Sequence, residues 1–117
     1  MNRVILHGFL SGVPEVRHTA AKGIAVAKFP LGVPDKLEPY NKAKTLWINV
    51  VAWGKLAEFC GENLTKSQDI IIEGRLQKSS WEKDGQRREQ IEVVAESLYF
   101  CGPHKKKRTQ EEDGIQW

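Results

Sequence analysis

Three tryptophans lie in segments whose alternating pattern is typical of β-strands. Trp47 and Trp53 are separated by an even number of residues, so both belong to one face of a predicted strand. Trp81 continues a polar face, since it has the parity of Glu73, Arg75, Gln77 and Ser79. An indole in that position is free to stack on a planar ring, as the bases of a single-stranded nucleic acid require. The alternative for Trp47 and Trp53 is that they pack in the protein core.

Basic residues lie close to these tryptophans and could neutralise phosphates. Lys55 follows Trp53 by two positions, and several cations surround the predicted turn after Trp81. The alternative for any one of them is an ordinary solvated surface cation, so the combination carries the argument. The candidate phosphate contacts are Arg3, Lys55, Arg75, Lys78, Arg87 and Arg88, with Arg17 and Lys28 as further candidates.

A long polar loop is predicted over residues 34–44, and loops of this length in small domains are often functional. It contains Tyr40 together with three lysines. The tyrosine could stack on a base, or it could anchor the loop to the domain.

Catalytic and metal sites are hard to assemble from this chain. His7, His18 and His104 do not occur at the spacing of metal ligands, and Cys101 with His104 forms one isolated pair. The glycines occur singly, without a phosphate-binding loop of the P-loop or dinucleotide type. We therefore expect a binding protein that is not an enzyme and needs neither a metal nor a cofactor.

The elements that position these residues follow from the apolar periodicity. At Gly54 the alternation gives way to an amphipathic helical spacing. The predicted strands are residues 3–10 with a continuation over 15–19, 24–33, 45–53, 70–81 and 90–100, with a helix over 55–64 and a hairpin turn over 83–86. Five strands with one helix between the third and fourth is the element order of an OB-fold, an all-β Greek-key barrel.

Length and composition allow one domain, which we place over residues 1–102, followed by a short charged tail over 103–117. The net charge of +3 is too small to prove a polyanionic partner. We expect no membrane association, because the chain has no apolar run long enough to cross a bilayer and no secretory signal pattern. Cys60 and Cys101 are expected to be free thiols in a reducing compartment, which indicates a cytoplasmic protein.

Several blocks of the chain resemble one family in the right order and spacing. They are MNRVILHGFL, Pro14-Glu15-Val16-Arg17, Ala25-Val26-Ala27, WINVVAWGKLAEFC, IIIEGRLQKSSWEKDGQRR and EVVAESLYF. Together they cover about residues 1–100 and look like a bacterial or phage single-stranded DNA-binding protein with one OB-fold per chain.

The resemblance implies a function, an assembly and site residues. Trp47, Trp53 and Trp81 stand where the family has base-stacking aromatics. Such proteins are usually homotetramers without a cofactor, and they protect single-stranded DNA during replication, recombination and repair, at the nucleoid. They also recruit partner enzymes through a C-terminal tip. Here the linker before the tip is almost absent, and the acidic, aliphatic and terminal aromatic positions are Glu111, Glu112, Asp113, Ile115 and Trp117.

Three alternatives remain open at this stage. The chain could be a specialised replication-restart or plasmid-encoded relative that acts mainly through protein contacts, with its tail as the active part. It could be an RNA-binding OB module, which would recognise 2′-hydroxyls. An OB-fold enzyme is the weakest alternative, because the chain lacks an acid–base or metal constellation.

Overall fold

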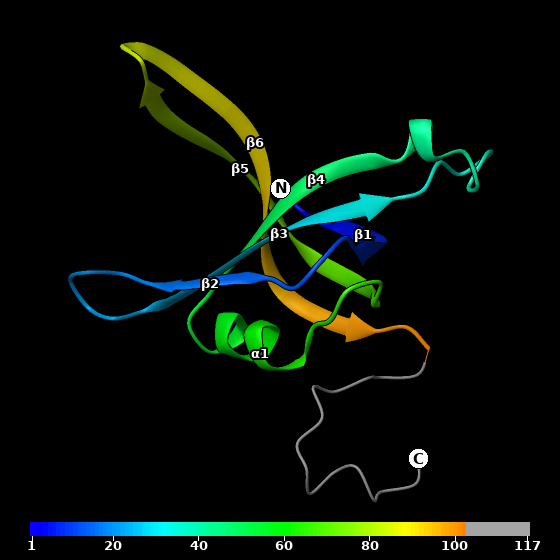
Figure 1. Ribbon diagram of the computed structural model, residues 1–117, viewed down its shortest axis with the longest axis horizontal. Helices are drawn as coiled ribbons and strands as arrows, with labels where there is room; N and C mark the ends of the chain where they lie inside the picture. The colour runs from blue at the N-terminus through cyan, green and yellow to red at the C-terminus, as the bar shows by residue number, and fades with distance from the viewer. Residues whose placement is uncertain (103–117) are drawn as a thin grey trace, which may run out of the picture.

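The computed structural model describes residues 1–102, and more than half of them lie in the strands of one curved sheet, with a helix against it (Figure 1). Its elements are β1 Val4–Leu10, β2 Glu15–His18, β3 Ala25–Val33, a 3₁₀ turn η1 Lys42–Lys44, β4 Leu46–Trp53, α1 Lys55–Asn63, β5 Asp69–Lys83 and β6 Gln86–Phe100. Strands thus alternate with short connections everywhere except at α1 and at the loop between β3 and β4.

The sheet closes into a barrel. Its strand order is β1-β5-β6-β4-β3-β2, and β1 pairs a second time, with the end of β3. β4 and β6 are joined by a short parallel pairing, while the other pairs are antiparallel. β1 and β2 are the two halves of the predicted first strand, divided by a bend. Counted in this way, five strands with one helix between the third and fourth form an OB-fold, so the predicted fold is confirmed.

The core follows from the alternation of the strands. Every second side chain of β3 is buried, as are Val50 and Ala52 of β4, and α1 covers the same side of the sheet with Ala57 and Cys60. The helix ends at Asn63, one residue earlier than predicted, because Leu64 has extended dihedral angles. Leu64 nevertheless remains fully buried, and its N–H donates to the Cys60 carbonyl at 3.0 Å.

Pro30 marks an interruption in the sheet, as its missing N–H suggests. On one side it pairs with Asn49 of β4. On the other side β3 pairs with β2 only as far as Lys28, and with β1 only from Leu31 onward. The proline therefore lies where β3 passes from one partner to the other.

A hairpin arm of β5 and β6 projects well beyond the barrel (Figure 1). Both strands are longer than predicted, and the turn consists of Asp84 and Gly85, which both have positive φ. This is the geometry of the tight two-residue turns that match the twist of paired strands. The loop between β3 and β4 projects in a different direction. No helix among residues 1–102 is long and apolar enough to span a bilayer.

The two cysteines should differ sharply in reactivity. Both are free thiols, but Cys60 has no exposed surface, and burial raises its pKa from 9.0 to about 12. Because the thiolate is the nucleophile, we expect iodoacetamide at mildly alkaline pH to alkylate Cys101 and leave Cys60 intact in the native protein. Peptide mass spectrometry measures this, with the denatured protein as the control in which both react.

The same pKa shift predicts a loss of stability at high pH. The folded state retains the Cys60 proton at pH values where the unfolded chain releases it. Stability from this group is complete below about pH 9 and declines as the pH rises toward 12. Equal alkylation of both native cysteines would contradict the burial on which both expectations depend.

Candidate nucleic-acid interface

The outer face of β4 carries two indoles with an apolar residue between them. Trp47 and Trp53 are each 49% exposed, so the prediction that they share an outward face is confirmed. Asn49 and Val51 lie between them in the same alternation, and Val51 is only 1% exposed whereas Asn49 is exposed. The outer face of β4 therefore presents two half-exposed rings with a buried aliphatic side chain between them.

Trp47 rests in a seat formed by two other strands. Gly32 is paired with Trp47 on β4 and with Phe9 on β1, so the two aromatic rings meet above a residue without a side chain. The rings make an edge contact, with centroids 5.5 Å apart and planes at 77°. A Cβ at Gly32 would lie 2.8 Å from Phe9 Cζ and 2.9 Å from two Trp47 ring atoms. The absence of that methyl group makes room for the edge contact between the two rings.

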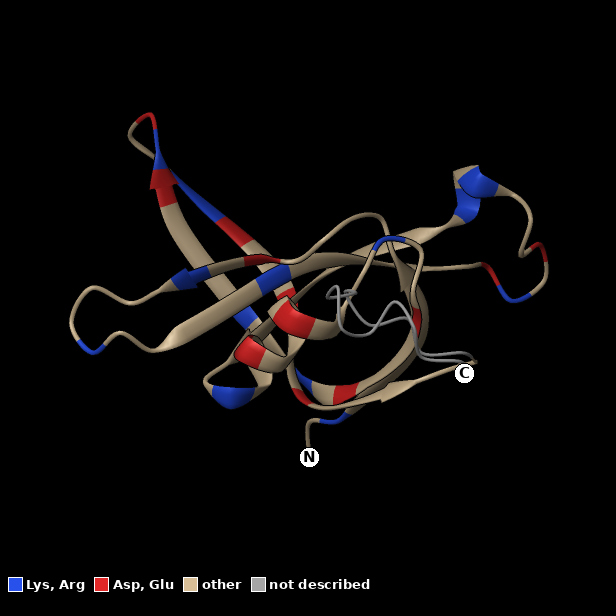
Figure 2. Cartoon of the chain, turned by 60° about the horizontal axis from the view of Figure 1, so that its bottom comes forward, with Lys and Arg blue, Asp and Glu red and all other residues tan. Residues whose placement is uncertain are grey.

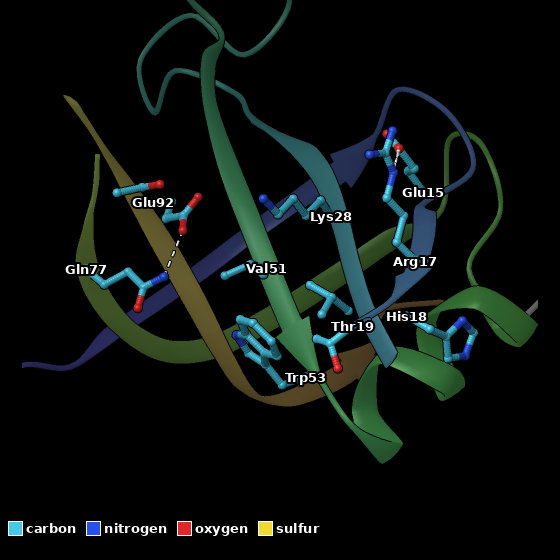
Figure 3. Close-up of a pocket in the computed structure, with 11 residues that line it drawn as sticks. Glu15, Arg17, His18, Thr19, Lys28, Val51, Trp53, Gln77 and Glu92 are labelled. Carbon is cyan, nitrogen blue, oxygen red and sulfur yellow. Dashed lines mark hydrogen bonds and ion pairs between the residues drawn. The ribbon is translucent and has the colours of Figure 1, made fainter. Parts of the chain in front are cut away.

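A groove of about 630 Å³ opens beside Trp53 (Figure 3). Five strands contribute to it, and its lining residues include Arg17, Lys28, Trp53, Gln77 and Glu92. A smaller hollow of about 240 Å³ extends it along β4 past Asn49 and Gln90. The groove thus begins at Trp53 and runs along β4 toward the end of the strand that carries Trp47.

The projecting arm continues the same face. In the hairpin register Trp81 is opposite Arg88, Ser79 is opposite Gln90, and Gln77 is opposite Glu92. Directly opposite residues lie on one face of a strand pair, so these three pairs form a row of side chains. The row leads from the arm into the groove. Asn49 Nδ2 donates to Gln90 Oε1 at 3.2 Å and joins the row to β4. Trp81 is 42% exposed at the outer end.

Two basic residues of the arm lie on the face opposite to Trp81. Lys78 and Arg87 have the other parity, and both pair with Glu89, at 3.2 and 3.3 Å. Figure 2 shows basic and acidic residues mixed along the arm rather than separated into one basic stripe. Near Trp81, the register places Arg88 and Lys83 on the tryptophan's side of the arm.

The remaining candidate cations are dispersed. Arg3 Nη2 pairs with Glu73 Oε2 at 2.8 Å, away from the groove lining. Arg75 has the parity of Gln77 and is exposed, and Lys55 begins α1 directly after the end of β4. Neither forms an ion pair with a residue in the described range 1–102.

The loop between β3 and β4 holds Tyr40 away from the domain. Asp35 accepts hydrogen bonds from the N–H groups of Leu37 and Glu38, and Asn41 caps η1 through the N–H of Ala43. Lys44 pairs with Glu38. Tyr40 is 95% exposed, so it does not anchor the loop.

Comparison with known proteins identifies the family. The sequence profile of the single-strand binding protein family matches residues 1–101. The chain belongs to this family. Membership in a family of binding proteins confirms the prediction that the chain is not an enzyme. The predicted partner segment from Glu111 to Trp117 lies outside the described residues.

Individual relatives agree with this assignment. Single-stranded DNA-binding protein 2 of Chlorobaculum tepidum is 33% identical over 98% of this chain and 80% of its own length. Single-stranded DNA-binding protein of Clostridium tetani is 43% identical over 86% of this chain and 70% of its own length. A third relative, single-stranded DNA-binding protein 1 of Chlorobaculum tepidum, is 36% identical, and the match covers 65% of it.

Sequence reasoning missed several residues that shape the outer face, namely the two beneath Trp47 and one in the groove. Phe9 and Gly32 carry no signal of their own, because their role depends on the register of three strands. Glu92 is placed by the contact of β4 with β6, which no local pattern predicts. The opposite faces of Trp81 and Lys78 could have been found, since the two residues differ in parity.

The seat of Trp47 can be tested with one methyl group. Gly32→Ala should displace the indole and lower the free energy of unfolding by about 1–3 kcal/mol, because the added Cβ overlaps both rings. The near-ultraviolet circular dichroism, which reports aromatic packing, should change with it. Gly12→Ala is the matched control, since a Cβ there meets nothing within 4 Å. Identical spectra and stability for the two variants would show that the seat does not constrain Trp47.

Proposed function

We propose that this chain binds single-stranded DNA with little sequence preference, by aromatic stacking and phosphate contacts. The observation that supports it most is the continuous outer face of the barrel and arm, which connects Trp53, the groove and Trp81, in a member of the single-strand binding protein family. Single-strand binding is the property named in the family's description and in the names of its relatives.

Stacking supplies the part of the affinity that does not depend on sequence. Trp47, Trp53 and Trp81 each expose close to half of their surface, so one ring face of each can receive a base. Such stacking is worth about 1–3 kcal/mol per base, and every base has a ring face to offer. Tyr40 is a fourth proposed contact, because its loop presents it to solvent close in sequence to Trp47.

Phosphate contacts supply the part of the DNA affinity that depends on the salt concentration. The proposed groups are Arg3, Lys55, Arg75, Lys78, Arg87 and Arg88. Arg88 leads this set because it shares the face of Trp81. Lys78 and Arg87 pair with the exposed Glu89, and Arg3, itself exposed, pairs with the partly buried Glu73. Exposed ion pairs contribute little stability, so a phosphate can replace the carboxylate of Glu89.

The wider role follows from the resemblance described above. We propose that the protein protects single strands during replication, recombination and repair, in the cytoplasm at the nucleoid. The tail over residues 103–117 would recruit partner proteins through Glu111, Glu112, Asp113, Ile115 and Trp117. An adaptor that works mainly through this tail would lose its activity when residues 111–117 are deleted, whereas the proposed DNA-binding protein would keep its DNA affinity.

We also propose a homotetramer. The outer face of β1, β5 and β6 exposes Ile5 and Tyr99, at 61% and 52%, with Ile71 paired to Tyr99 between them. Exposed apolar side chains in a group are typical of protein interfaces. Light scattering should give about four times the chain mass of 13.3 kDa, both with and without oligo(dT). The mass of a single chain under both conditions would overturn the tetramer.

Binding itself has a direct spectroscopic test. Oligo(dT) should quench the tryptophan fluorescence, and raising the salt from about 50 to about 200 mM should weaken binding by tenfold or more. The ribo-oligonucleotide of the same sequence should bind more weakly, whereas a preference for it would favour the RNA-binding alternative. If oligo(dT) neither quenches the fluorescence nor binds in a salt-dependent way, the proposed function is wrong.

Two variants measure separately how much stacking and how much phosphate contact contribute to the DNA affinity. Trp81→Ala should raise the Kd for oligo(dT) by about 5- to 150-fold, since one stacked base is lost. Arg88→Ala should reduce the slope of log Kd against log salt concentration by about one, because one phosphate contact is lost. Lys66→Ala is the matched charge control, because Lys66 lies in the turn after α1 and does not line the groove.

A further inference from the structure

The arm joins the barrel at a narrow root, where β5 and β6 lose their other strand partners. β5 pairs with β1 only as far as Gly74, and β6 pairs with β4 only at Val93 and Val94. Beyond these positions, among residues 1–102, β5 and β6 have only each other as strand partners. A two-stranded ribbon is marginally stable on its own and twists strongly. The direction of the arm therefore depends on the contacts at its root.

The side chain of Asn2 extends the pairing of β1 with β5 at this root. Val4 is opposite Gly74, so the antiparallel register places Asn2 level with Leu76. Asn2 Nδ2 donates to the Leu76 carbonyl oxygen at 2.8 Å, and Asn2 Oδ1 accepts from the Leu76 N–H at 2.9 Å. A carboxamide has the donor and the acceptor of a peptide group, so this side chain pairs with β5 as a further strand residue would.

Asn2 acts at the point where β5 bends away from the barrel. A bulge between Glu73 and Gly74 interrupts the register of β5 with β6, and such bulges bend a strand. Before the bulge, Arg3 Nη2 pairs with Glu73 Oε2 at 2.8 Å. On the opposite edge of the arm, β4 holds the Gln90 side chain through a hydrogen bond of 3.2 Å. The two hydrogen bonds of Asn2 hold the edge of β5 beyond the bulge.

The length of the arm amplifies any movement at the root. Trp81 lies five residues beyond Leu76 on β5, which is about 17 Å in a strand. A tilt of about 10° at Leu76 would therefore move the indole by about 3 Å. That displacement is comparable with the separation of about 3.5–4 Å between carbon atoms in contact, so it is enough to disrupt stacking on a base.

We propose that Asn2 is a positioning residue for the nucleic-acid interface. Its side chain fixes the direction of the arm and so aligns Trp81 and Arg88 with the outer face of the barrel. It acts through the backbone of Leu76 and not through contact with DNA. This inference rests on the proposed function and adds to it the group that sets the position of the arm.

Hydrogen exchange of the Leu76 amide measures the pairing without any ligand. Asn2→Ala removes the acceptor of this N–H, so its exchange should become about fivefold faster or more, while the amides of the barrel core keep their rates. Asn63→Ala is the matched control. It removes a hydrogen bond of 3.0 Å from another side-chain amide to a backbone carbonyl, that of Phe59 on α1, and should leave the Leu76 rate unchanged.

A double-mutant cycle measures the effect on DNA affinity. Asn2→Ala should raise the Kd for oligo(dT) by about 3- to 10-fold. Asn2→Asp should weaken binding as well, because it keeps the side-chain size but turns a carboxylate oxygen toward the Leu76 carbonyl. In a protein that already carries Trp81→Ala and Arg88→Ala, the Asn2→Ala change should alter the Kd by less than about twofold, since the contacts that it aligns are gone. Asn63→Ala should leave the Kd unchanged in both proteins.

The outcomes separate this inference from the proposed function. If the native protein does not bind oligo(dT), the proposed function fails and the positioning role with it, whatever the exchange of the Leu76 amide shows. If it binds, but Asn2→Ala leaves the Leu76 exchange rate or the Kd unchanged, the positioning role alone is overturned. An equal rise in Kd with and without Trp81 and Arg88 would also overturn it, because general destabilisation would then explain the loss.

Discussion

The second pairing of β1, with the end of β3, is the constraint on which the rest of the structure depends. At this pairing Leu10 is opposite Leu31, and both side chains lie in the core with almost no exposure. The backbones approach so closely that a Cβ at Gly8 would lie 2.4 Å from the Gly32 carbonyl oxygen. Because strand side chains alternate, the same closure that directs the leucines inward directs Phe9 and the open position of Gly32 outward. The same strand pairing thus forms part of the barrel core on its inner face and the seat of Trp47 on its outer face.

The charged residues inside the groove differ in composition from those outside it. The basic groups outside the groove are dispersed over both faces of the arm and the barrel, several of them in ion pairs, whereas the groove combines Lys28 and the paired Arg17 with Glu15 and Glu92. A groove lined only by cations would attract the backbone of a nucleic acid into its depth. In the proposed function, a groove of mixed charge contributes little to that attraction, and the exposed cations elsewhere on the barrel and arm supply it. The small net charge of the chain is consistent with this division.

Much of the fold could be predicted from local patterns. The alternation before Gly54 and the helical spacing after it gave β4 and α1 nearly to the residue, and the polar face of Trp81 correctly indicated an exposed indole. Contacts between distant segments could not be predicted in this way. The aromatic pair of Phe9 and Trp47 needs the registers of three strands, and the burial of Glu92 needs the parallel contact of β4 with β6. A sequence gives the parity of a residue within its strand, but the neighbour across the sheet is set by the closure of the whole barrel.

The seat of Trp47 also has a consequence for the thermodynamics of binding. A surface indole on an open strand explores several rotamers, and a ligand that stacks on it must restrict them, which weakens the association. Here the neighbouring ring and the missing methyl group confine the indole when the chain folds, before any ligand arrives. The ordering entropy of that side chain therefore belongs to folding rather than to binding. If a base stacks on this ring as proposed, the stacking enthalpy is opposed by little loss of side-chain freedom.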